Sequence, residues 1–161
     1  MPRHPTTDAA ARRGERRRSM TAKDLLSGPN PERFSESKIK RSWELLLEAL
    51  RLNPCAHGGH ALLVAATALR TFHYHFRLPS ASGAHSPYSV FGLIPEVPTA
   101  RDPAAVEKYY RQASDLLRRA AADPDHPCYP AFFKAARLVE DAWAFLSDPD
   151  RKASLDARYN S

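Results

Sequence analysis

Fourteen prolines divide this chain of 161 residues, and their placement constrains the fold more than any other feature. Proline lacks a backbone N–H donor and clashes with the preceding helical turn, so it is rare inside a helix. Four windows contain no proline and are rich in residues that favour helix: 32–53, 55–78, 104–123 and 131–148. A short fifth helix is expected after Pro149. Nothing has the pattern of a strand, so the sequence predicts an all-α protein.

The first two windows are expected to pair as an antiparallel helical hairpin over residues 21–78. In the first window apolar residues recur at steps of three and four, which places them on one helical face: Ile39, Trp43, Leu46, Leu47 and Leu50. The second window is apolar around most of its circumference from Ala61 to Phe76. Gly58 and Gly59 form a turn between them, and a short connection makes consecutive helices neighbours.

Residues 79–103 are rich in Pro, Ser and Gly, and they enclose one apolar patch that is long enough to dock: Tyr88, Val90, Phe91, Leu93 and Ile94. We assign residues 79–87 as a linker. Asp102 followed by Pro103 predicts a helix start, because an Asp side chain caps free amides and proline presets φ at the first helical position.

The last long helix is expected from about Ala131 to Leu146. Either Asp148 or Ser147 can cap the short helix that follows, in which Pro149 takes the first position.

The net charge of +6 belongs mostly to the first residues of the chain. Residues 1–18 hold six arginines against Asp8 and Glu15, which is net +4 and leaves +2 for the rest. We expect residues 1–20 to be a disordered basic tail. Clustered arginines bind polyanions irrespective of sequence, so a polyanion-binding or targeting role is one alternative and a solubilising end is the other. The arginines concerned are Arg12, Arg13, Arg16, Arg17 and Arg18.

The sequence predicts no membrane span, because no stretch approaches the ~18 to 20 apolar residues that a span requires. It predicts no secretory signal, because no short apolar run follows the charged residues near the start. We therefore expect a cytoplasmic or nuclear protein with no membrane partner. Its two cysteines, Cys55 and Cys128, are expected to be free thiols in a reducing compartment.

Neither a metal site nor an enzyme is expected. Cysteine sulfur and histidine imidazole are the usual zinc ligands, but the spacings of the candidates match no structural zinc pattern: Cys55, His57, His60, His126 and Cys128. The sequence has no nucleophile elbow, phosphate-cradling glycine loop or dinucleotide fingerprint. We therefore expect no catalytic residues and no cofactor.

The stretch from Tyr88 to Asn160 resembles a J-domain, the module of DnaJ-like co-chaperones. Three segments carry the resemblance: Tyr88-Ser-Val-Phe-Gly-Leu93, then Val106 with Tyr110-Arg111, and Asp141-Ala-Trp-Ala-Phe-Leu-Ser-Asp-Pro-Asp-Arg151 with Asp156. Trp143 and the preceding helices look like a land-plant group in which a tetratricopeptide-like hairpin precedes the J-domain, and Ala49-Leu-Arg-Leu-Asn-Pro54 resembles the end of a tetratricopeptide helix.

The resemblance implies that residues 88–161, here called the J-like region, form an antiparallel helix pair with short flanking helices. Its core would contain Tyr88, Leu93, Tyr110, Leu117, Val139, Trp143 and Leu146. It also implies that a basic helix face meets a DnaK-type chaperone, and this face contains Lys108, Arg111, Arg118 and Arg119. The alternative is that the same residues form a solvated helix face without a partner.

The chain departs from the family at the residues that carry its activity. A J-domain triggers ATP hydrolysis through a His-Pro-Asp tripeptide, but counting on from Tyr110-Arg111 those places hold Arg118, Arg119 and Ala120. Ala136 also replaces the family's phenylalanine, with Phe132 and Phe133 one turn earlier. We therefore expect a degenerate J-domain that is an adaptor or competitor in chaperone-linked assembly and does not stimulate the ATPase.

The alternative is a nucleic-acid-associated nuclear protein that uses its basic tail, with weak and non-specific binding.

Overall fold

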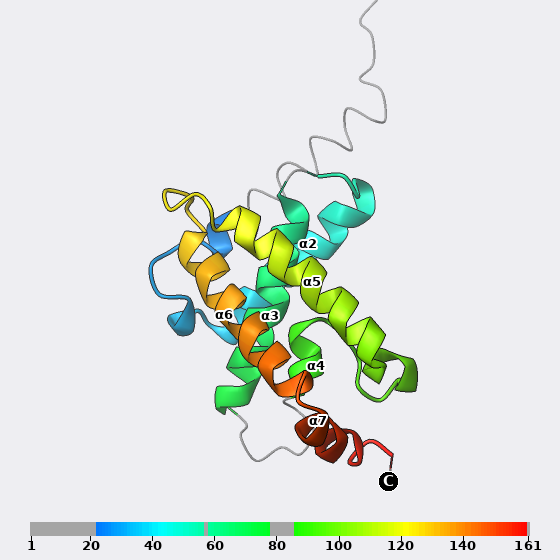
Figure 1. Ribbon diagram of the computed structural model, residues 1–161. Helices are drawn as coiled ribbons and strands as arrows, with labels where there is room; N and C mark the ends of the chain where they lie inside the picture. Colours follow the sequence, from blue (N-terminus) through cyan, green and yellow to red (C-terminus); the bar gives the residue numbers. More distant parts are fainter. Residues whose placement is uncertain (1–21, 57, 78–85, 161) are drawn as a thin grey trace, which may run out of the picture.

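The computed structural model describes residues 22–56, 58–77 and 86–160, and every regular element in these ranges is helical (Figure 1). The all-α prediction is therefore confirmed for the described chain. The elements are η1 (Pro31–Arg33), α2 (Glu36–Leu52), α3 (Gly59–Arg77), α4 (Pro87–Val90), η2 (Pro98–Arg101), α5 (Pro103–Ala120), α6 (Tyr129–Leu146) and α7 (Pro149–Asp156).

The four windows without proline each contain one long helix, and the short helix after Pro149 is present as α7. The main difference is at the start of α6, which begins at Tyr129 instead of about Ala131 and so includes Pro130. Proline is tolerated there because the N–H groups of a first helical turn have no acceptor within the helix.

The two expected helix caps have different outcomes. Of the two candidates before α7, Asp148 is the cap: its carboxylate accepts from the N–H of Asp150 at 3.0 Å and of Arg151 at 3.3 Å. The expected side-chain cap at Asp102 is wrong, because its side chain makes no capping hydrogen bond. Asp102 also ends η2, and its own N–H and carbonyl bond to Thr99 and Val106, so backbone bonds hold it on both sides.

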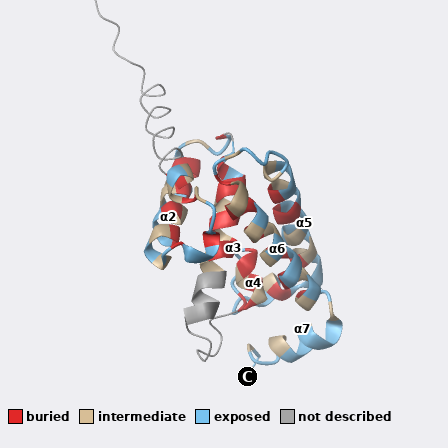
Figure 2. Cartoon of the chain, turned by 90° about the vertical axis from the view of Figure 1, so that its left-hand side faces the viewer, coloured by how far each residue is buried: buried red, intermediate tan, exposed pale blue. Residues whose placement is uncertain are grey.

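Helix α3 packs against α2, α4, α5 and α6, and its buried residues lie at the centre of the molecule (Figure 2). Three of its alanines and Leu69 are fully buried: Ala65, Ala66 and Ala68. They belong to one hydrophobic cluster that contains residues of α2, such as Ile39, and of the J-like region, such as Leu117. The helices on either side of the expected linker therefore share a core. Most of that linker, 79–85, lies outside the described residues, and Pro87 already opens α4.

The inward face of α2 is narrower than the sequence pattern predicts. Ile39, Leu46 and Leu50 are buried, whereas Trp43 is half-buried and Leu47 is 41% exposed. Successive residues of a helix are about 100° apart, so Leu47 lies one such step from Leu46, beyond the face that α3 covers. Leu47, which the spacing places on the same face as Leu46 and Leu50, is therefore not part of the core.

Two glycines allow turns or close approaches next to α3. Gly59 is the first residue of α3, and a Cβ atom there would lie 2.9 Å from Cδ2 of Leu50, so glycine lets the start of α3 approach the end of α2. Gly92 follows α4 and has φ of 75°, in the left-handed region that favours glycine.

The central role of α3 predicts that Leu69→Ala lowers the free energy of unfolding by ~2–5 kcal/mol, through lost burial and the cavity left behind. Leu52→Ala, at a site that is 40% exposed on α2, is the control and should cost under ~1 kcal/mol. Urea denaturation followed by circular dichroism measures both. Equal losses in the two variants would contradict the central packing of α3.

Candidate partner-binding surfaces

The four basic residues expected on the chaperone-facing surface are all exposed residues of α5: Lys108, Arg111, Arg118 and Arg119. Two of them form ion pairs within the helix. Arg111 lies 2.7 Å from the carboxylate of Glu107, and Arg119 lies 2.9 Å from that of Asp115. Each acid is four residues before its base, the favourable order, but such exposed pairs contribute only about 0.3–0.5 kcal/mol.

A third carboxylate reaches this face from α6. The Tyr110 hydroxyl donates to both carboxylate oxygens of Glu140, at 3.0 and 2.8 Å, and the Ser114 hydroxyl donates to one of them at 3.2 Å. Arg118 donates to the Ser114 hydroxyl oxygen at 3.3 Å. Partial burial, and then the carboxylate of Glu140, raise the pKa of Tyr110. Two of the four cations of α5 are therefore paired within the helix, and Glu140 is linked to a third, Arg118, through the Ser114 hydroxyl.

Aromatic stacking joins the helices beneath this surface. The rings of Tyr110 and Trp143 are stacked, with centroids 4.5 Å apart and planes 7° from parallel, and Phe91 meets Tyr110 edge-on at 6.3 Å. These contacts connect the end of α4 with α5 and α6. Of the residues expected in the J-like core, Tyr88, Leu117, Val139 and Leu146 are buried, while Leu93, Tyr110 and Trp143 are half-buried against the core.

The two expected replacements for the missing helix phenylalanine behave differently. Phe132 is buried in the core, whereas Phe133 is exposed. Residues 132, 135 and 139 follow the three-and-four spacing of one helical face, and residue 133 is about 100° away from it. Phe132 is therefore the residue that fills the interior next to Ala136.

Polar contacts attach α7 to the rest of the fold, and the sequence analysis did not predict them. The hydroxyl of Tyr88 donates to the carboxylate of Asp156, which also pairs with Lys152 at 2.7 Å. Arg101, a buried residue of η2, donates to the side-chain oxygen of Asn160 at 2.9 Å and to the backbone carbonyl of Asp156 at 3.4 Å. Burial, and then the Asp156 carboxylate, raise the pKa of Tyr88. Tyr88 belongs to the first segment that resembles a J-domain and Asp156 to the last, so these two segments are in contact.

A groove of about 810 Å³ lies between α2, α3 and α5, with the turn after α4 as a further wall. Its lining is mainly apolar and includes Trp43, Leu47, Leu63, Leu93, Ile94 and Leu116. Arg70 of α3 also lines it, with its guanidinium carbon 4.7 Å from the centre of the Trp43 ring. Sequence reasoning missed this groove, because it arises where three helices meet and no local pattern marks it.

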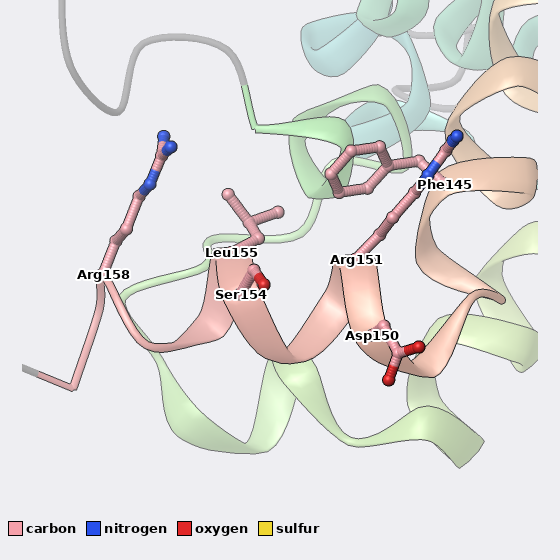
Figure 3. Close-up of a pocket in the computed structure, with 6 residues that line it drawn as sticks. All are labelled: Phe145, Asp150, Arg151, Ser154, Leu155 and Arg158. Atoms are coloured by element: carbon pink, nitrogen blue, oxygen red, sulfur yellow. The ribbon is translucent and has the colours of Figure 1, made fainter.

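A smaller pocket of about 330 Å³ lies between α7 and the end of α6 (Figure 3). The side chain of Arg151 extends towards Phe145, with its guanidinium carbon 5.8 Å from the ring centre, while Arg158 lies apart (Figure 3). Asp150 lines the same pocket. Charges of both signs therefore line a surface that is built largely from one short helix, which gives a ligand few converging groups.

The cysteine and histidine candidates are dispersed. Cys55 is an exposed free thiol and Cys128 is a buried one. The Cys128 thiol donates to the carbonyl of Lys23 at 3.1 Å, and burial raises its pKa to about 11. His60 bonds to the carbonyl of Pro54 at 2.7 Å, and His57 lies outside the described residues. Within the described ranges no three potential metal ligands gather.

The tail arginines, Arg12, Arg13, Arg16, Arg17 and Arg18, lie outside the residues that the structure describes, and their expected role stays a prediction. In the described part of the chain, no helix combines the length and apolar character needed to cross a membrane. Comparisons with protein-family models, with curated proteins and with solved structures found no match to this chain.

His126 gives the structure a testable pH dependence. Its Nδ1 atom accepts from the N–H of Cys128 at 3.0 Å, so the ring is neutral in this arrangement. Burial, and then the charge of Lys23, lower the pKa of His126 below its usual 6.5, while Asp123 acts in the opposite direction. The folded protein therefore takes up this proton at a lower pH than the unfolded chain does.

The stabilisation from neutral His126 is complete above pH ~6.5 and is lost as the pH falls through the lower folded-state pKa. We expect the melting temperature to fall between about pH 7.5 and about pH 5, and to fall less in His126→Asn, whose amide oxygen can accept the same bond without titrating. Differential scanning fluorimetry measures both. An identical fall in parent and variant would show that His126 does not contribute.

Proposed function

We propose that this chain is a non-catalytic, J-domain-like interaction module that acts as an adaptor or competitor in chaperone-linked protein assembly. The order of helices from α4 to α7 is compatible with the short-long-long-short order that the resemblance implies. Contact between Tyr88 and Asp156, which come from its two ends, supports the same reading.

The observation that carries the non-activating part of the proposal is the length of α5. The helix continues to Ala120, so Arg118, Arg119 and Ala120 lie within its last turn, and not in the loop where a His-Pro-Asp tripeptide would act. The loop after α5 contains Asp123-Pro-Asp-His-Pro127, but His126 is engaged with the backbone of Cys128. A DnaK-type chaperone would therefore meet a helix end and no activating tripeptide.

The proposal also holds that the chain is not an enzyme. Catalytic groups are commonly found where shifted pKa values and a cleft coincide. The groups here with shifted pKa values are Tyr88, Tyr110, His126 and Cys128, and none of them lines either described pocket. Tyr88, Tyr110 and Cys128 each bond to a residue distant in sequence, and His126 accepts from the backbone N–H of Cys128, which supports structural roles.

A single-turnover ATPase assay with a DnaK-type chaperone tests the proposal. The chain alone should leave the hydrolysis rate at background. Added in excess over an active J-protein, it should lower the stimulated rate, because it occupies the same surface without triggering hydrolysis. Lys108→Glu combined with Arg118→Glu should abolish this inhibition.

The matched control is Lys40→Glu, an exposed lysine on α2. Stimulation by the chain alone would contradict the non-activating assignment. A lack of inhibition would contradict the competitor role.

Converting residues 118–120 to the family's tripeptide tests whether helix α5 itself prevents activity. We expect Arg118→His, Arg119→Pro and Ala120→Asp together to restore at most weak stimulation, since proline inside a helix costs ~3 kcal/mol and the loop geometry is absent. The same ATPase assay, with a melting curve of the variant, measures both effects. Full stimulation by a stably folded variant would show that these residues can adopt the family's loop.

A further inference from the structure

Exposed apolar side chains are concentrated at the groove between α2, α3 and α5. Six large apolar side chains of the described residues are exposed, and three of them line this groove: Leu47 (41%), Tyr109 (41%) and Ile94 (62%). Burial of apolar area is the main source of binding free energy, and binding sites are typically concave with a mainly apolar lining. The groove therefore has the composition of a binding surface.

Two hydroxyl groups of the groove wall are already used by the fold. The Thr67 hydroxyl donates to the carbonyl of Leu63 at 2.8 Å, and the Thr71 hydroxyl donates to that of Thr67 at 3.2 Å. An extended peptide gains affinity by pairing its backbone with a strand edge, and the described residues offer none. A helical segment satisfies its own backbone bonds and presents only side chains, so a helix suits these walls.

Arg70 gives the groove a charge preference. Its guanidinium lies over Trp43, and no carboxylate lines the groove. Among the described residues Arg70 has no ion-pair partner. A carboxylate brought to this guanidinium would form a charge-assisted, potentially bidentate pair against the apolar wall.

We propose that this groove binds an amphipathic helical segment of a partner protein, with apolar residues facing the groove and an acidic residue opposite Arg70. The chain's own first residues fit poorly, because residues 1–18 carry six arginines that Arg70 would repel. The groove is formed with α2 and α3 and lies beside the basic face of α5, so the inference goes beyond the proposed J-like function and does not rest on it.

Selection of a random peptide library displayed on phage, with the complete chain as target, provides the probe. The enriched peptides should share apolar residues at i, i+3 or i+4, and i+7, together with at least one acid. The best peptide is then synthesised, and its Kd is measured by fluorescence anisotropy.

Two leucines of α2 provide a matched pair of variants. Leu47 lines the groove and is 41% exposed, whereas Leu52 is 40% exposed and does not line it. Leu47→Lys should weaken peptide binding at least about tenfold, while Leu52→Lys should change Kd by less than about twofold. Both sites are at the surface, so both variants are expected to fold, and circular dichroism checks this.

A charge exchange tests the role of Arg70 without relying on one variant. Changing the peptide's acid to lysine should weaken binding to the parent chain, and Arg70→Glu should recover binding of that lysine peptide. Absence of enriched peptides, or equal weakening by Leu47→Lys and Leu52→Lys, would overturn the proposal. Enriched peptides without helical spacing, or failure of the charge exchange, would also overturn it. Self-association of the chain that Leu47→Lys abolishes would overturn it as well, since a second copy would then occupy the groove.

Discussion

The packing of α3 between α2 and the α5–α6 pair is the constraint on which the other features depend. Its buried alanines let the neighbouring helices approach closely, and Leu69 fills the centre of the same cluster. The groove exists because α3 separates α2 from α5 and forms the wall between them. The exposed face of α5 exists because its opposite face, with Val106 and Leu117, is buried in this core.

The last helix is held by a different kind of interaction. None of the residues of α7 is fully buried. Leu155 packs against the core from the outside, and the polar contacts that attach the helix are those of Asp156 with Tyr88 and of Arg101 with the end of the chain. Segments with little buried apolar area open locally at lower free energy than a core does. Helix α7 is therefore expected to open before α3, α5 or α6, and the contact between the two ends of the J-like resemblance would be lost with it.

Proline placement and helix propensity were sufficient to locate the long helices, because both act within a few residues of sequence. The start of α6 was shifted because Pro130 is tolerated in a first turn, and the expected side-chain cap at Asp102 was wrong, although α5 does begin at Pro103. Periodicity identified the inward residues of α2 but placed Leu47 among them, since how much of a face is covered depends on the partner helix. The positions of Arg70 over Trp43 and of Glu140 beside Tyr110 join residues of different helices, so no local pattern could predict them.

The helices on both sides of the expected linker form one core, and a fragment without α2 and α3 can show whether each side depends on the other. Residues 86–161 contain α4 to α7 but lack α3, whose buried face covers α5 and α6 in the complete chain. Thermal denaturation of this fragment beside the complete chain, followed by near-ultraviolet circular dichroism, is the decisive measurement. We expect a cooperative transition for the complete chain and no sharp transition for the fragment. A fragment that melts cooperatively at the temperature of the complete chain would contradict the shared core.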